Sequence, residues 1–61
     1  MIKIIVVEDD VKLNNLIKTI LEKNSYIVDS AYNPNEAFLK MEKSSYNLII
    51  SGIIISEIIR L

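Results

Sequence analysis

The chain has 61 residues and contains no cysteine, no histidine and no tryptophan. Disulfides, zinc sites and haem ligation are excluded together, because each needs cysteine or histidine. Glycine and proline occur once each, so the chain has no glycine-rich loop of the kind that binds nucleotides. A domain this short buries only about 60% of the surface of its unfolded chain. Association with another chain is therefore the means of stabilisation that the composition leaves open.

Strong charge of one sign is absent as well. Seven basic and eight acidic residues give a net charge of −1, and no basic block is present, so we expect no direct binding to nucleic acid or to an anionic membrane. The amino end carries no signal or transit peptide pattern. The longest apolar region, residues 48–61, contains charged and polar residues and is shorter than the roughly 20 residues of a membrane span. We expect a cytoplasmic protein.

The spacing of apolar residues predicts the order strand, helix, strand, helix, strand. Residues 2–7 form a β-branched run typical of a strand buried on both faces, and residues 11–23 have the spacing of an amphipathic helix. Residues 26–31 and 46–51 are further strand candidates, with a helix over 34–43 between them. Strands joined by helices imply right-handed crossovers and a parallel sheet, and hence an α/β fold.

Particular residues are expected to fix the helix ends. Asp10 is the expected cap of the first helix, and Asn24 is the expected left-handed residue at its end. Asn33 is the expected cap of the second helix, followed by a proline at the first helical position, and Glu36 is expected to reach back to the cap amide. Phe38 is expected to face the core.

Three acids follow the first strand directly. Glu8, Asp9 and Asp10 would lie at the carboxyl edge of a parallel sheet, where open α/β folds place their ligand sites. Crowded carboxylates repel one another, and a divalent cation such as Mg²⁺ relieves that repulsion. The alternative is that Asp10 only caps the helix while Glu8 and Asp9 are solvated.

Several segments in order carry a resemblance to a known family. The run from Ile4 to Asp10, the helix after it, residues 26–37 and residues 46–51 resemble the amino-terminal half of a bacterial response regulator receiver domain (CheY-like). The resemblance implies a flavodoxin-like fold, of which this chain would be the parallel three-stranded β-α-β-α-β half with strand order 2-1-3. We expect dimerisation to complete the sheet. We treat residues 1–61 as one truncated receiver-like domain, with 1–51 family-like and 52–61 a divergent apolar tail.

The resemblance also implies a site, from which this sequence departs. Glu8 and Asp9 match the family's acidic pair, with Asp9 as the direct Mg²⁺ ligand, while Gly52 stands where the family has its phosphate-accepting aspartate. Without that carboxylate we expect no phosphotransfer and no enzymatic activity, no required cofactor, at most weak and vestigial Mg²⁺ binding, and no histidine kinase as partner.

The chain would then act as an interaction module. A sheet that ends at its third strand has an open edge, and open edges pair. We expect a homodimer through this edge and the isoleucines beyond it, which are covered by the partner whether 53–61 is strand or helix. The expected interface residues are Leu48, Ile50, Ile53, Ile54, Ile55, Ile58 and Ile59.

Two alternatives stay open. The family itself suggests a receiver of a two-component phosphorelay that controls a DNA-binding output. Alternatively, the loss of the family pattern from Gly52 onward indicates a decayed or deliberately made half-fold with no selected function. Phosphorylation by a small phosphodonor separates the first alternative from the interaction module.

Overall fold

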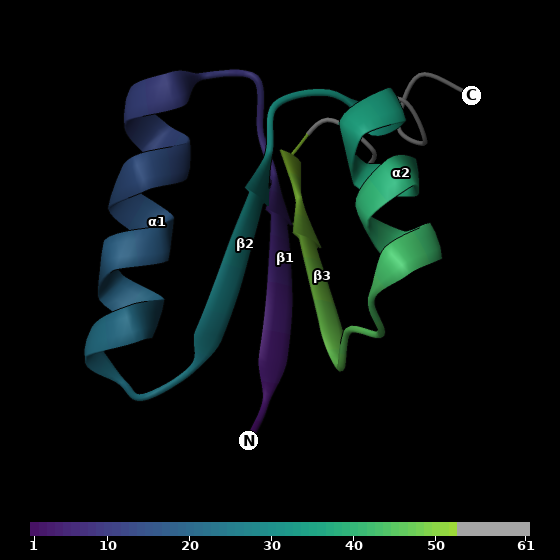
Figure 1. The fold of residues 1–61 in the computed structure, drawn as a ribbon. Helices are drawn as coiled ribbons and strands as arrows, with labels where there is room; N and C mark the ends of the chain where they lie inside the picture. Colours follow the sequence, from purple (N-terminus) through teal and green to yellow (C-terminus); the bar gives the residue numbers. More distant parts are fainter. Residues whose placement is uncertain (53–61) are drawn as a thin grey trace.

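The computed structural model describes residues 1–52. Helices and strands alternate along the chain in the order β1 (Lys3–Val7), α1 (Val11–Lys23), β2 (Ile27–Ala31), α2 (Pro34–Lys43) and β3 (Leu48–Ser51). The strands form one parallel sheet in the order β2-β1-β3 (Figure 1). The predicted α/β fold and strand order are confirmed. The expectations for residues 53–61 fall outside the described residues.

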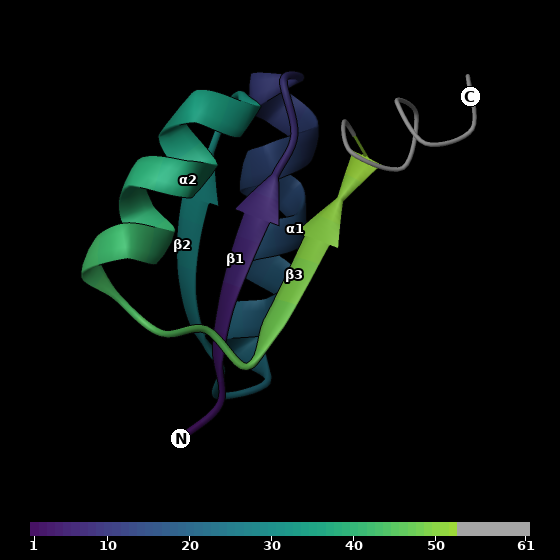
Figure 2. The same ribbon diagram turned by 90° about the vertical axis from the view of Figure 1, so that its right-hand side faces the viewer.

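The central strand β1 is the buried core of the sheet. Ile4, Ile5, Val6 and Val7 are each at most 2% exposed, which agrees with a strand covered on both faces. Helix α1 lies on one face of the sheet and α2 on the other (Figures 1 and 2). Because side chains alternate along a strand, β1 supplies both cores at once.

Each face of the sheet has its own apolar cluster. On the α1 side, Ile4 and Val6 pack with Val28 of β2, and on the α2 side Ile5 and Val7 pack with small alanines of β2 and α2. The partly buried residues that complete the two clusters are Ile17, Leu21, Tyr26 and Ile50 on the first side and Met41 and Tyr46 on the second. The clusters share no buried residue, so β1 joins two thin cores.

The predicted bounds of α1 are confirmed, but the prediction that Asn24 is left-handed is wrong. The Asp10 side chain accepts a hydrogen bond from the Leu13 N–H at 3.1 Å. Asn24 is not left-handed, since its φ is −96°, and Ser25 takes the positive φ of 69° instead. The Asn24 side chain donates to the Ile20 carbonyl at 2.8 Å. This bond holds Asn24 against the last turn and moves the reversal of the chain one residue on.

Helix α2 begins as predicted, with one shift in its cap. Asn33 accepts from the Glu36 N–H at 2.8 Å. The Glu36 carboxylate accepts from the N–H of Tyr32, also at 2.8 Å, and not from the cap amide of Asn33. The prediction for Phe38 is wrong, because this side chain is 57% exposed while Ala37 is buried. Successive residues turn by about 100° around a helix, so a helix centred on Ala37 carries Phe38 outward.

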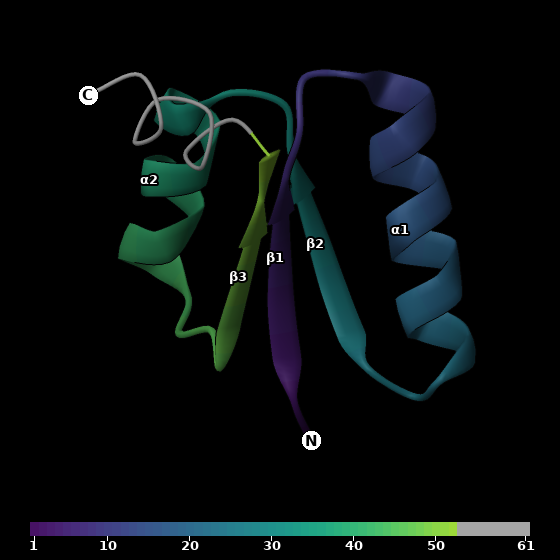
Figure 3. The ribbon, with the colours of Figure 1, turned by 180° about the vertical axis from the view of Figure 1, so that it is seen from behind.

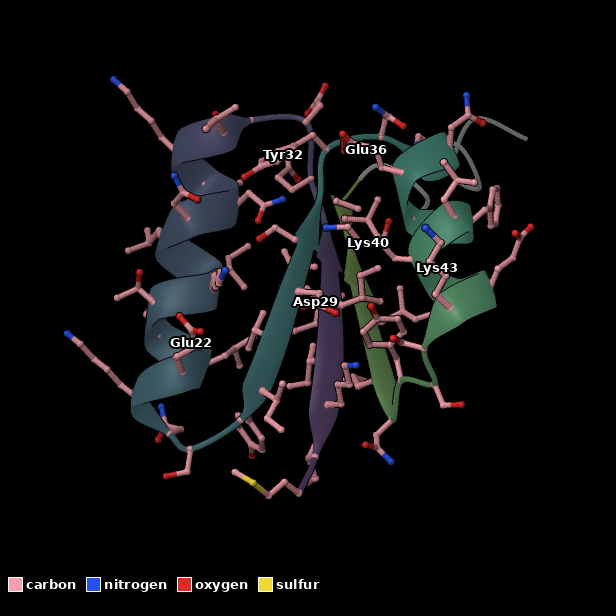
Figure 4. All side chains as sticks on the ribbon, viewed as in Figure 1. Glu22, Asp29, Tyr32, Glu36, Lys40 and Lys43 are labelled. Carbon is pink, nitrogen blue, oxygen red and sulfur yellow. The ribbon has the colours of Figure 1, made fainter. Side chains whose placement is uncertain are left out.

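Two contacts near the amino ends of the strands fix the register of β3. Asn47 accepts from the Lys3 N–H through its side chain at 2.8 Å and donates its own N–H to the Lys3 carbonyl at 2.7 Å. The Tyr46 hydroxyl donates to Asp29 of β2 at 2.6 Å, and Figure 4 shows Asp29 on the sheet. Partial burial raises the pKa of Tyr46 to about 12, and the bonded Asp29 carboxylate adds to the rise.

We predict that Tyr46→Phe lowers the free energy of unfolding by about 1.5 kcal/mol at neutral pH, because it removes one hydrogen bond to a charged acceptor. The raised pKa stabilises the fold below about pH 10, and this stabilisation is lost as the pH rises toward 12. The unfolding free energy of the parent chain should therefore fall more steeply over that range than that of the variant. Urea unfolding followed by circular dichroism at one protein concentration measures both effects. Tyr32→Phe is the matched control, and equal losses in the two variants would contradict the prediction.

Candidate functional site

The three acids lie in the loop between β1 and α1, at the carboxyl edge of the sheet. Val7 at the end of β1 pairs in register with Ser51 at the end of β3, so the residues that follow these two strands are neighbours. Glu8 is half-buried, whereas Asp9 and Asp10 are exposed. The loop therefore brings Glu8 close to Gly52 and leaves Asp9 toward solvent.

Glu8 is held by several hydrogen bonds. Its N–H donates to the Ala31 carbonyl of β2 at 3.0 Å, and its carboxylate Oε1 accepts from the Asp10 N–H at 3.1 Å. Asp10 is itself the cap of α1. The loop is thus a compact turn in which the Glu8 carboxylate accepts a hydrogen bond from the Asp10 backbone. Asp9 makes none of the hydrogen bonds described within this turn.

Asn14 is a residue of this site that the sequence reading missed. Although it lies in the first turns of α1, it is completely buried. Its amide donates to the Glu8 carbonyl at 3.1 Å and the Ala31 carbonyl at 3.0 Å, with a longer contact of 3.5 Å to the Val6 carbonyl. The available signal was a polar residue on the inner, apolar side of the predicted helix. Asn14 ties the ends of β1 and β2 to the acid loop.

Gly52 lies against the Glu8 side chain. A Cβ atom at position 52 would stand 2.3 Å from Oε2 of Glu8, far inside van der Waals contact. The Glu8 carboxylate therefore takes up the space in which a side chain at this position would begin. The position expected for an acceptor aspartate faces the carboxylate of Glu8, from the loop that follows β1.

The donor set fits a divalent cation poorly. Within residues 1–52, no group of three or more histidine, cysteine, aspartate or glutamate side chains is arranged to hold a metal ion. Of the two expected ligands, Glu8 is engaged with the Asp10 amide and packed on Gly52, which leaves Asp9. Magnesium needs near-octahedral oxygen ligation, and Gly52 adds no carboxylate. Weak Mg²⁺ binding by Glu8 and Asp9 stays a prediction.

The two expected interface residues on β3, Leu48 and Ile50, lie on the same face of the sheet but differ in exposure. Leu48 is 51% exposed, while Ile50 is half-buried against the core on the α1 side. Ile49, which the sequence prediction left out, is 46% exposed and points to the opposite face. The alternation of side chains along a strand was the signal for Ile49. The other expected interface residues, Ile53, Ile54, Ile55, Ile58 and Ile59, lie outside the described residues.

Helix α1 also exposes an apolar stripe, formed by Leu13, Leu16 and Ile20, which are between 42% and 56% exposed. Leu13 lies nine residues before Glu22, about two and a half turns away and so on the opposite side of the helix. Figure 4 shows Glu22 on the side of α1 nearest the viewer, so the stripe faces the side seen in Figure 3, where β3 is the near edge of the sheet.

None of the helices within residues 1–52 is long and apolar enough to cross a membrane.

Comparison with known proteins gives one family. The profile of the response regulator receiver domain matches residues 4–59. The transcriptional regulatory protein ResD of Bacillus subtilis (strain 168) is 38% identical over 48 residues, which cover 79% of this chain. The match spans 20% of the length of ResD. No solved structure gave a significant match.

We predict that Asn14→Ala lowers the free energy of unfolding by about 2 kcal/mol, because buried carbonyls lose their donor. Hydrogen exchange at the Glu8 amide should accelerate more than exchange in the middle of β1, since the lost bonds hold the acid loop. Chemical unfolding and amide exchange measured by NMR test the two effects. The exposed neighbour provides the control, and Asn15→Ala should change stability by less than about 0.5 kcal/mol. Similar losses of stability in the two variants would contradict the role of the Asn14 amide in holding the acid loop.

Proposed function

This chain belongs to the response regulator receiver family, and on that basis we propose that it is a receiver module that acts by associating with another protein and not by accepting a phosphoryl group. The observation that carries the proposal is the contact between Gly52 and Glu8. Position 52 has no side chain, and its side-chain space is occupied by a carboxylate held from β1.

Other groups near position 52 are poor substitutes for the missing acceptor. Ser51 is buried at the end of β3, and a serine needs an adjacent base to act as a nucleophile. The chain contains no histidine to serve as that base. Glu8 has a carboxylate, but using it as the acceptor would leave Asp9 alone to hold the cation that neutralises the phosphoryl oxygens. Phosphoryl transfer is therefore not the function that this site supports.

The direct test is incubation of the chain with Mg²⁺ and acetyl phosphate, followed by intact mass measurement. We expect no gain of a phosphoryl group, because neither residue 51 nor residue 52 supplies an activated nucleophile. A stable or hydroxylamine-sensitive adduct on any residue would overturn the proposal. Fragmentation of the adduct would then identify the acceptor.

A second prediction concerns the missing carboxylate. Gly52→Asp should push the Glu8 carboxylate out of its present position, since the new Cβ would start 2.3 Å from Oε2. The variant should gather three carboxylates at one edge of the sheet and bind Mg²⁺ at least about tenfold more tightly than the parent chain. Isothermal titration with MgCl₂ measures the change, and the thermal midpoint of the variant should rise with Mg²⁺.

Gly52→Asn is the matched control for that prediction. It displaces Glu8 in the same way and adds a side chain of the same size, but it brings no charge. We expect its Mg²⁺ affinity to remain that of the parent chain. Equal affinities in the aspartate and asparagine variants would show that position 52 does not face the acid loop.

The similarity to ResD favours a second candidate function. Its name describes a transcriptional regulatory protein, and this chain matches 20% of its length. The alternative is therefore the receiver part of a regulator whose output binds DNA. Phosphorylation of the chain by acetyl phosphate would favour this candidate over the phosphate-independent module.

A further inference from the structure

Strand β2 directs the backbone of every second residue away from β1. The Ile27 N–H donates to the Ile2 carbonyl at 3.0 Å. The Ala31 carbonyl accepts from the Glu8 N–H, also at 3.0 Å. The first and last residues of β2 therefore face β1, and the register between them is continuous. Because backbone groups alternate in direction along a strand, the even-numbered residues of β2 direct their N–H and C=O groups to its outer edge.

Helix α2 places two side chains on that outer edge. Lys40 donates through Nζ to the Ser30 carbonyl. Glu36 accepts through Oε2 from the N–H of Tyr32, the residue directly after β2, at 2.8 Å. Figure 4 shows Lys40 between α2 and β2. Residues four apart lie on the same side of a helix, so the ammonium and the carboxylate reach the edge together.

This pair of side chains reproduces the hydrogen bonds of a strand residue. In a parallel sheet, one residue of a neighbouring strand donates its N–H to a carbonyl and accepts, through its own C=O, from the N–H two residues further on. The Lys40 ammonium stands in place of that N–H, and the Glu36 carboxylate stands in place of that C=O. Hydrogen bonds to charged groups are also stronger than those between neutral amides. The outer edge beside Ala31 is therefore bonded as if a further strand lay there.

We infer that Glu36 and Lys40 close the outer edge of β2 to strand addition by another chain. An incoming strand would have to displace both side chains from their backbone partners before it could form its own hydrogen bonds. Charged side chains, lysine in particular, are a common protection of edge strands. In this chain the protecting charges come from the adjacent helix, so the packing of α2 on the sheet determines whether the edge is closed.

The local structure of α2 explains how the pair reaches the edge. Ala37 is completely buried on the sheet, and its small side chain lets the helix approach closely. Since successive residues turn by about 100°, Glu36 and Lys40 lie on the same flank of Ala37. The Asn33 side chain caps the first turn by accepting from the Glu36 N–H. Edge closure thus accounts for the shift reported above, in which the Glu36 carboxylate bonds to residue 32 and not to the cap amide.

The outward amides of β2 allow strand addition to be measured. A strand added at this edge would accept hydrogen bonds from the N–H groups of Val28 and Ser30, and it would slow their exchange with solvent. If the added strand belongs to a second copy, the slowing must increase with chain concentration. A general loss of stability has the opposite effect, because it accelerates exchange and does not depend on concentration.

The test removes both side chains in the variant Glu36→Ala/Lys40→Ala. We expect exchange at Val28 and Ser30, followed by NMR, to slow at least about threefold between about 20 and 500 μM chain, because the uncovered edge pairs with that of another copy. Sedimentation velocity should show a higher mass over the same range. In the parent chain, exchange at these two amides should be independent of concentration.

The variant Glu42→Ala/Lys43→Ala is the matched control. Both residues are exposed on α2, and their removal takes one acid and one base from the same helix. Within residues 1–52 neither side chain is bonded to β2. We therefore expect exchange at Val28 and Ser30 in this variant to be as insensitive to concentration as in the parent chain.

Two results would overturn the inference. One is concentration-independent exchange at Val28 and Ser30 in the folded double variant, and the other is slowing of the same size in the parent chain. If the double variant does not fold, because Glu36 lies in the first turn of α2, Lys40→Ala is compared with Lys43→Ala. This pair leaves the helix start intact, and equal concentration dependence in the two single variants would overturn the inference as well.

Discussion

The burial of β1 on both faces and along both edges is the constraint on which the rest of the structure depends. Its four residues from Ile4 to Val7 contact one apolar cluster under each helix. Within residues 1–52, no other strand could take the place of β1 beneath either helix. The two clusters are small, and each is left open toward β3, where leucine and isoleucine side chains remain exposed. The same strand delivers Glu8 to the carboxyl edge, so core and site share one support.

The residue pattern allowed the element order and both helix starts to be predicted, and the family resemblance implied the strand order. The element order and helix starts depend on local signals: a β-branched run for β1, helical spacing for α1, and short polar side chains at Asp10 and Asn33. Local signals did not predict which of two neighbouring residues takes the left-handed conformation after a helix. Asparagine suits a left-handed conformation better than serine, yet Ser25 takes the positive φ, because the hydrogen bond of Asn24 to Ile20 holds Asn24 against the last turn of α1.

The site was less predictable because its geometry depends on contacts between strands. Pattern and resemblance both pointed to Glu8, Asp9 and Gly52, but the position of the Glu8 carboxylate over Gly52 depends on a side-chain rotamer. Asn14 was missed for a different reason. A buried amide is costly unless it is bonded, and its carbonyl partners come from β1, β2 and the loop, which become neighbours only after folding.

The hydrogen bonds between Lys3 and Asn47 join residues that are 44 positions apart. Strand β2 can reach β1 by closing a shorter loop, through α1 alone, whereas β3 must wait for the whole intervening chain. Loop closure costs more entropy as the loop lengthens, so β3 should join the sheet last during folding. The amide of Lys3 should therefore become protected from hydrogen exchange late, because its acceptor is the Asn47 side chain just before β3.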